Sequence, residues 1–223
     1  MCVNSHDILS GYPMQNPQQQ SNNLHQKNYD EEILVVRCNT LFQNNPAWHG
    51  IHPEISKFIP AITTQGCFMP RAHAETDPAF KQIIPYMLFM FKKKLFVMQR
   101  KSSASEQRLA SKFSLGIGGH IRQEDIANNN IIDWANREFE EEVTYHGSKK
   151  FETIGILNDD SNPVGQVHLG FIILIHADSD QISINDEHKS GVLLTRDECI
   201  ALMPQMESWS QICFQFLLDQ NIL

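Results

Sequence analysis

The order of predicted elements indicates an α/β protein. Apolar runs rich in β-branched residues, which are typical of strands, lie before and after one amphipathic helix near residues 131–143, and a second such helix closes the chain. A chain of 223 residues is long enough for one domain with a buried core and some additional segments. We therefore expect a single α/β (α+β) domain over residues 31–223, with an N-terminal extension at 31–80.

Residues 1–30 are rich in Gln and Asn and have almost no apolar periodicity. Such a composition buries too little apolar surface to offset the entropy lost on ordering. We expect a disordered tail here. The alternative is an arm that binds a partner.

Before the first helix, the sequence predicts a strand, a long loop and a hairpin. Glu32 to Phe42 reads as the strand, and Gln43 to Gln65, with its prolines and glycine, as the loop. Two apolar runs, Ile84 to Phe91 and Leu95 to Arg100, flank three consecutive lysines at 92–94. We expect a hairpin that turns at the lysines.

After that helix, two further strands and two helices are predicted. Phe151 to Leu157 is a strand, and Val167 to His176 is an apolar strand long enough to be central. Its His168 is either a sheet histidine or a pocket residue, and the sheet role is favoured. Arg196 to Met203 predicts a short helix. The C-terminal helix, Gln205 to Asp219, carries an apolar stripe expected to be core: Trp209, Ile212, Cys213, Phe216 and Leu217.

The segment from Leu115 to Tyr145 carries the most informative pattern. A short apolar strand leads into Gly118-Gly119, and a helix follows after a polar connector. That helix bears one arginine and three glutamates: Arg137, Glu138, Glu141 and Glu142. Helical positions three or four apart lie on one side of the axis, so the glutamates share a face.

A row of glutamates is most often a solvated helix face, and like charges at this spacing repel one another. A divalent cation would remove the repulsion, and clustered carboxylates suit Mg²⁺ or Mn²⁺. Two glycines after a strand leave backbone amides or carbonyls accessible to an ion or a phosphate. The combination favours a site for metal and phosphate.

At this point the sequence resembles the Nudix hydrolases. Their signature is Gly, five residues, Glu, seven residues, then Arg-Glu-U-x-Glu-Glu-x-Gly-U, where U is a bulky aliphatic residue. Gly119 fits the start, and residues 137–145 fit the second half. This chain has Asp125 in place of the first Glu, eleven connector residues at 126–136, and Thr144 in place of the late Gly. Aromatic residues, Phe139 and Tyr145, occupy the aliphatic positions.

The resemblance implies a mixed sheet between helices and hydrolysis of a diphosphate bond with Mg²⁺ or Mn²⁺. It makes Glu141 and Glu142 metal ligands together with the carbonyl of Gly118, and it places Gly119 at the substrate. Glu138 would complete the metal set or activate water, and Arg137 would orient the carboxylates. A distal loop often adds a carboxylate, for which Glu187 is the first candidate and Asp186 the second.

Residues 68–86 resemble the lead-in of a poorly characterised Nudix branch, the predicted MutT-like phosphoesterases. In that light Arg71 and Lys81 are candidate contacts to substrate phosphate. The alternative is that Arg71 forms an ordinary pair with Glu75, four residues later.

Composition narrows the remaining function classes. The net charge of −8 argues against a nucleic-acid surface, and no apolar run approaches the ~20 residues of a membrane span. No signal peptide is evident. Five cysteines without Cys-x-x-Cys spacing favour a reduced, cytoplasmic protein without structural zinc.

Three functions remain open. The first is a metal-dependent hydrolase of a nucleoside diphosphate linked to another moiety, and the second is a catalytically silent module that binds a nucleotide-like ligand. An isomerase of isoprenoid diphosphates would need a catalytic cysteine, and Cys67 has no evident partner for that role. The substrate's attached group is not specified, and a homodimer is possible by analogy with relatives.

Overall fold

The computed structural model describes residues 3–4, 31–43, 46–100, 112–128, 131–185 and 188–223. Apart from Val3 and Asn4, the tail expected at 1–30 lies outside these residues, as do Asp186 and Glu187. None of the helices in the described segments combines the length and hydrophobicity needed for a bilayer span.

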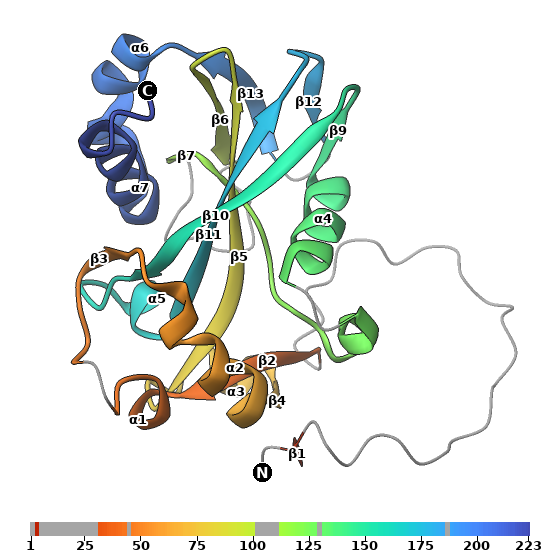
Figure 1. The fold of residues 1–223 in the computed structure, drawn as a ribbon, viewed down its shortest axis with the longest axis vertical. Coiled ribbons are helices and arrows are strands. Elements are labelled where there is room, and N and C mark those ends of the chain that lie inside the picture. Colours follow the sequence, from red (N-terminus) through yellow and green to blue (C-terminus); the bar gives the residue numbers. More distant parts are fainter. Residues whose placement is uncertain (1–2, 5–30, 44–45, 101–111, 129–130, 186–187) are drawn as a thin grey trace, which may run out of the picture.

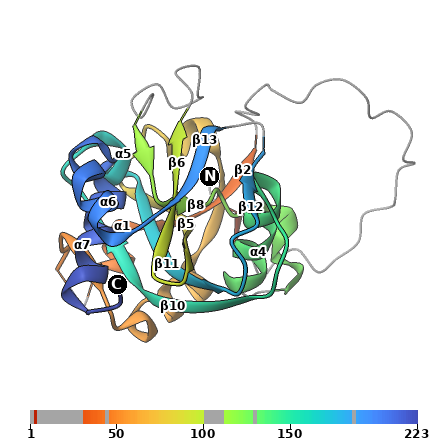
Figure 2. The same ribbon diagram turned by 90° about the horizontal axis from the view of Figure 1, so that it is seen from above.

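A mixed β-sheet runs through the middle of the molecule, with helices on both faces (Figures 1 and 2). Helix α4 covers one face, and α6 and α7 cover the other, so the predicted α/β class and the sandwich of sheet and helices are confirmed. The helices of the described residues are α1 (Cys38–Leu41), α2 (Ile59–Gln65), α3 (Arg71–Ala74), α4 (Ile131–Glu142), α5 (Pro163–Gln166), α6 (Arg196–Leu202) and α7 (Ser208–Asp219). Short 3-10 helices are η1 (Ile55–Lys57), η3 (Gln123–Asn128) and η4 (Met203–Gln205).

The main sheet follows the order β1-β4-β2-β5-β11-β10-β3; β6 and β8 also pair with β5, and β7 and β13 pair with β6. Its strands are β1 (Val3–Asn4), β2 (Glu32–Arg37), β3 (Gly50–His52), β4 (Cys67–Pro70), β5 (Phe80–Phe91), β6 (Lys94–Arg100), β7 (Phe113–Ser114), β8 (Gly116–Ile117), β10 (Lys149–Asn158), β11 (His168–Ala177) and β13 (His188–Leu194). A separate pair joins β9 (Val143–Tyr145) and β12 (Ile182–Ile184). Strands from the 31–80 extension therefore belong to the same sheet as the rest of the chain.

Two parallel strands, β5 and β11, form the centre of the sheet, and both have buried side chains on both faces. Along β5, Tyr86 and Leu88 pack toward α7, while Met87 and Phe89 pack toward α4. Side chains alternate between the two faces of a strand, and a strand covered on both faces is apolar throughout. This explains the continuous apolar runs in the sequence and confirms the central position expected for Val167 to His176.

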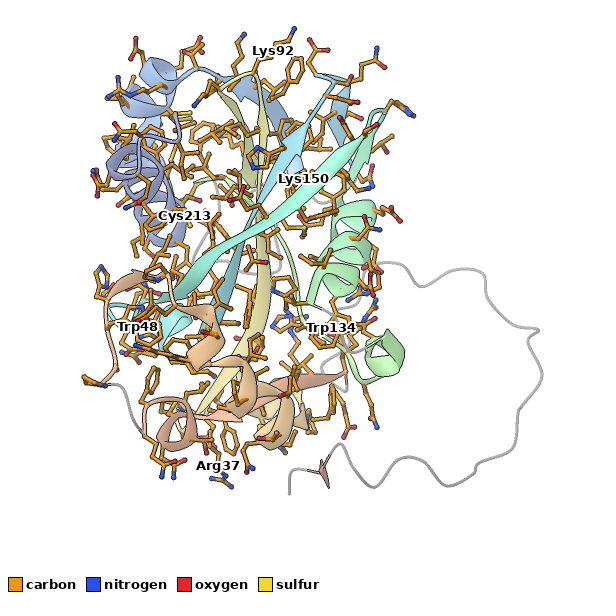
Figure 3. The ribbon with its side chains drawn as sticks, viewed as in Figure 1. Arg37, Trp48, Lys92, Trp134, Lys150 and Cys213 are labelled. Carbon is orange, nitrogen blue, oxygen red and sulfur yellow. The ribbon has the colours of Figure 1, made fainter. Side chains whose placement is uncertain are left out.

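The hairpin predicted at the three lysines is confirmed. Phe91 pairs with Lys94 across the turn, and the two central residues, Lys92 and Lys93, have φ values of 47° and 63°. Two consecutive positive φ angles are those of the tight turn that matches the twist of a hairpin. Figure 3 labels Lys92 at this exposed end of the sheet.

Two predictions for the extension are wrong. The strand expected to reach Phe42 ends at Arg37, and the chain continues as α1. The loop expected at 43–65 contains β3, η1 and α2 within its described residues. Pro60 is the second residue of α2, where a helix has no need of the backbone N–H that proline lacks.

The C-terminal helix is confirmed as α7, and it packs on the sheet as predicted. Its buried side chains are Trp209, Ser210, Cys213, Phe214 and Leu217, while Ile212 and Phe216 are partly exposed. Figure 3 labels Cys213 on this helix. Cys67, the residue considered for an isomerase, is a buried side chain of β4 that packs with Ile33, Val35 and Ala74.

Candidate active site

Helix α4 forms where the sequence predicts it. Ala135 and Phe139 are buried against the sheet, and the ring of Phe139 stacks on Phe89 of β5 with centroids 6.2 Å apart. On the polar side, Glu141 is half exposed and Glu142 is partly exposed, whereas Glu138 is only 8% exposed. The carboxylates of the helix therefore differ in exposure, from the buried Glu138 to the half-exposed Glu141.

Arg137 connects these carboxylates. Its Nη1 donates to Oε1 of Glu141 at 2.9 Å, and its Nη2 donates to Oε1 of Glu138 and to Oδ2 of Asp125, the latter at 2.8 Å. Nη2 also lies 3.2 Å from the backbone carbonyl oxygen of His120. A planar guanidinium with several fixed donors is suited to hold carboxylates in one orientation. These contacts agree with the orienting role expected for Arg137.

A second guanidinium, that of Arg122, lies close to two of the same carboxylates, those of Glu141 and Asp125. Its Nη2 donates to Oε1 of Glu141 at 3.0 Å, and its backbone N–H donates to Oδ2 of Asp125 at 2.8 Å. Sequence reasoning missed this residue, because only the fold brings it within reach of α4. Its place three residues after Gly119 was the one available signal.

The Gly118-Gly119 turn is packed too closely for side chains. A Cβ at Gly118 would lie 2.0 Å from the carbonyl oxygen of Pro85, and a Cβ at Gly119 would lie 2.2 Å from Oε2 of Glu138. The missing side chains thus let the Glu138 carboxylate lie directly against the backbone of the turn. A carboxylate oxygen and peptide groups are brought together at this point.

Burial changes the acidity of Glu138. The pKa of Glu138 is raised from its usual 4.5 to about 7: desolvation by burial is the main cause, the charge of Arg137 opposes it, and the nearby charge of Glu141 adds to it. Burial alone would lower the pKa of Arg137, but the charges of Glu138, Glu141 and Asp125 more than offset this, so its net pKa is raised. A carboxyl group that titrates near neutral pH can either release its proton to a cation or accept one from water.

The donor set fits a hard divalent cation. Glu138, Glu141 and Glu142 offer only oxygen atoms as ligands. Because Gly119 has no side chain, the Glu138 carboxylate lies against the backbone of the turn, and the preceding residue, Gly118, carries the carbonyl expected to be a ligand. Oxygen ligands of this kind suit Mg²⁺ or Mn²⁺. These residues would hold the ion, and the metal-ligand roles assigned to them remain predictions.

Comparison with known proteins supplies the family. A scan against models of protein families finds no match. The protein YmaB of Bacillus subtilis (strain 168) is 30% identical over 201 residues, which span 84% of this chain and 98% of YmaB. The crystal structure of Tm1382, a protein assigned to the Nudix hydrolases, matches with a TM-score of 0.73 and 28% identity over 85% of this chain and 100% of Tm1382. The chain belongs to the Nudix superfamily.

The structure accommodates two departures from the Nudix signature, the longer connector and Thr144. The longer connector begins as η3, whose residue Asp125 accepts a hydrogen bond from Trp134 of α4 through its backbone oxygen at 2.7 Å. Figure 3 labels Trp134 at this end of the helix. At the other end, α4 stops at Glu142 and the chain passes directly into β9, where Thr144 donates to the side chain of Asn185 at 2.9 Å. No glycine is required for that ending.

The distal carboxylate of the Nudix site is not described, because Glu187 and Asp186 lie outside the described residues. The neighbouring Asn185 reaches the end of α4: its backbone N–H donates to the carbonyl of Glu142 at 2.9 Å, and its amide donates to that of Glu141 at 3.0 Å. The assignment of Glu187 stays a prediction.

The two predicted phosphate contacts have carboxylate neighbours. Arg71 lies 3.3 Å from Glu31 and 3.6 Å from Glu75, so the alternative pair with Glu75 is present. Lys81 is 1% exposed, and its ammonium donates to Asp160 and, at 2.8 Å, to the carbonyl oxygen of Gly165. In this Nudix chain both cations already have anionic partners within the protein.

A depression of about 650 Å³ lies against the outer side of α4 in this Nudix fold. Its lining includes Arg137 and Glu141 at one end; the full set is Ile132, Asp133, Asn136, Arg137, Glu140, Glu141 and Phe151. The volume is in the range of small-molecule sites. Three of its side chains are acidic, so an anionic ligand would be repelled there unless a cation were also bound.

Proposed function

We propose that this chain hydrolyses the diphosphate bond of a nucleoside diphosphate linked to another moiety, using Mg²⁺ or Mn²⁺. The observation that carries the proposal is the convergence of Glu138 and Glu141 on Arg137, with Glu138 packed on Gly119. The ion would be held by Glu141, Glu142, the carbonyl of Gly118 and the distal Glu187, and Glu138 would either complete this set or activate the water. A diphosphate brings several negative charges, which the acidic surface of α4 would accept only together with a cation.

The residues of the chain have separate roles in this proposal. When bound, the cation would neutralise charge on the phosphates and make water a better nucleophile. In its alternative role as the base, Glu138, whose pKa is about 7, would accept the proton as a water oxygen attacks phosphorus and the bond to the bridging oxygen breaks. Arg137 and Arg122 keep the Glu141 carboxylate oriented. The backbone N–H of Gly119 is the proposed contact of this turn to a substrate phosphate.

Arg71 and Lys81 are the proposed further contacts to the substrate. Each would have to exchange a carboxylate partner for a phosphate oxygen. The partner of Lys81, Asp160, is 47% exposed, so it can be hydrated when the ammonium turns to another anion. A homodimer acting in the cytoplasm completes the proposal.

The experiment is a hydrolysis screen of the full-length chain. A panel of nucleoside diphosphate derivatives is incubated with Mg²⁺ or Mn²⁺, beside the variants Glu141→Gln and Glu140→Gln. Glu140 is the matched control, because it lies on the same helix but bonds Asn136 and Lys149 instead of the arginines. We expect metal-dependent turnover that falls at least about 100-fold in Glu141→Gln and is retained in Glu140→Gln.

Other outcomes would favour other functions. Turnover that is equal in wild type and Glu141→Gln would overturn the assignment of α4. A complete lack of turnover, together with stabilisation of the fold by one of the compounds, would favour the silent binding module.

A further inference from the structure

A second group of ligand-type side chains lies apart from the α4 carboxylates. Glu75, His120 and His168 each direct one ligand atom to a common region, and these atoms lie within 4.8 Å of one another. Glu75 follows α3, His120 follows β8 and His168 begins β11, so three distant segments meet here; α3 and β11 can be followed in Figure 1, and β8 in Figure 2.

The hydrogen bonds of the two imidazoles fix which nitrogen could bind a metal. Nδ1 of His168 lies 2.7 Å from the carbonyl oxygen of Val164, and Nε2 of His120 lies 2.8 Å from Oε1 of Gln82. Because both oxygens are acceptors, these nitrogens carry the protons, and the lone pairs are on Nε2 of His168 and Nδ1 of His120. Metal-binding histidines characteristically hold their second nitrogen in this way.

Gln82 gives an independent indication of a ligand. It is fully buried on β5, directly opposite His168 in the parallel pair. While its oxygen accepts from His120, its Nε2 is a buried donor without a hydrogen-bond acceptor among the described residues. A buried donor of this kind is costly unless something supplies an oxygen atom. A water or phosphate oxygen on a bound ion would supply it.

Glu75 supplies the charge of the group. Arg71 lies 3.6 Å from its Oε1, and the carboxylate side chain is 18% exposed. Arg71 therefore holds the Glu75 carboxylate in one orientation. Carboxylates that bind metals are commonly oriented in this way by a neighbour that is not itself a ligand. Two imidazoles with one carboxylate suit Zn²⁺ and related transition metals, whereas Mg²⁺ prefers oxygen ligands throughout.

We propose that Glu75, His120 and His168 bind one divalent transition-metal ion of the imidazole-preferring class, with Zn²⁺ as its representative. Three protein ligands leave one position of a tetrahedral site for a water or phosphate oxygen. Zinc–nitrogen bonds of about 2.0 Å place ligand atoms about 3.3 Å apart, so the three side chains draw closer when the ion binds. The site uses imidazole, so the absence of a cysteine motif does not bear on it.

The proposed zinc site neighbours the Gly118-Gly119 turn without sharing its ligands. His120 follows Gly119 directly, and its backbone carbonyl accepts from Arg137. The side chains that would bind the ion come from different elements than α4. The two metal sites can therefore be removed one at a time.

The test measures Zn²⁺ binding to the full-length, chelator-treated chain by competition with a chromophoric chelator, and Co²⁺ binding by visible absorption. The ligand variants are Glu75→Gln, which preserves size, and His168→Gln. The matched control is His176→Gln, since His176 lies on the same strand and pairs with Glu152 instead. The double variant Glu141→Gln/Glu142→Gln removes the α4 carboxylates.

We expect one tightly bound Zn²⁺ per chain and visible Co²⁺ bands in the wild type, in His176→Gln and in the α4 double variant. Each ligand variant should weaken Zn²⁺ binding at least about 100-fold, because loss of a residue that merely supports a ligand already costs 10- to 100-fold. A wild type that binds no Zn²⁺ stoichiometrically would overturn the proposal, as would ligand variants that bind like the wild type. Near-ultraviolet circular dichroism checks that each variant is folded. If His168→Gln is unfolded, the Zn²⁺ affinity of Glu75→Gln tests the proposal.

Discussion

Nη2 of Arg137 donates a hydrogen bond to Oδ2 of Asp125 at 2.8 Å, across eleven intervening residues of chain. Asp125 stands where the Nudix signature has glutamate, and its carboxylate is 6% exposed. The same oxygen accepts the backbone N–H of Arg122. One buried atom therefore connects the segment after the Gly-Gly turn with the charged face of α4, and the extra connector residues do not break that link.

Replacement of Asp125 by alanine should lower the free energy of unfolding by about 2–3 kcal/mol. Arg137 would lose one of its buried partners, and the backbone N–H of Arg122 would lose its acceptor. Urea denaturation measures the change. Asp133→Ala is the control: this exposed residue lies in the first turn of α4, so its loss should cost less than about 1 kcal/mol. Equal losses would contradict the role given to Asp125.

Gly119→Ala should both destabilise the fold and weaken metal binding. The new Cβ would lie 2.2 Å from Oε2 of Glu138, so the carboxylate has to move, at a cost of about 1–3 kcal/mol. Urea denaturation and Mn²⁺ titration give the two readouts. The double variant Gly119→Ala/Glu138→Asp should recover part of the stability, since the shorter acid leaves space for the methyl group. If Gly119→Ala behaved like the wild type, the close packing described here would be incorrect.

The stability of the metal-free protein should fall as pH rises from about 5 to 8. The folded-state pKa of Glu138 is raised from 4.5 to about 7, so between these values the native protein binds a proton that the unfolded chain has lost. This stability is fully present below pH 4.5 and is lost as pH rises through 7. The shift of roughly 2.5 units corresponds to at most about 3 kcal/mol.

Denaturation in the presence of a chelator at several pH values measures this dependence. Glu138→Gln cannot titrate, so subtracting its curve from that of the wild type isolates the contribution of Glu138. Parallel curves would show that Glu138 has an ordinary pKa. Added Mg²⁺ should reverse the trend in the wild type, because the ion binds the deprotonated carboxylate.

Lys81→Met should lower the free energy of unfolding by about 2–3 kcal/mol. The ammonium is buried and bonds Asp160 and the carbonyl of Gly165, although the exposure of Asp160 reduces the penalty for leaving that carboxylate alone. Lys57→Met, which removes an exposed partner of Glu54, should change the free energy of unfolding much less. A phosphate contact by Lys81 predicts a raised KM as well. An unchanged KM would restrict Lys81 to a structural role.

The sequence predicted elements whose signals are local. Periodicity or turn residues within one segment predict four of these elements: helix α4, helix α7, the hairpin at Lys92 and the central strand β11. The prolines at 43–65 led to the wrong prediction of a loop, because Pro60 lies in the first turn of α2, where proline is compatible with a helix. Apolar content also extended β2 too far, although the chain turns into α1 after Arg37.

Contacts between distant segments could not be predicted in the same way. Arg122 meets Glu141 because β8 pairs with β5 and α4 packs on both strands. Glu75, His120 and His168 meet where α3, the segment after β8 and the start of β11 come together. The signature resemblance identified the α4 carboxylates, but it has no counterpart for these residues. Their spacing in the chain, of 45 and 48 residues within the second group, matches no local motif (120 − 75 and 168 − 120).

The most direct test of the account is the location of the cation, which can be measured without a known substrate. Electron paramagnetic resonance counts unbound Mn²⁺ during titration of the full-length chain in a Glu75→Gln background, so that the second cluster does not contribute. We expect one Mn²⁺ site whose affinity falls at least about 10-fold on Glu141→Gln and is unchanged on Glu140→Gln. Equal affinity in all three proteins would contradict a metal site on α4, and with it the proposed hydrolysis.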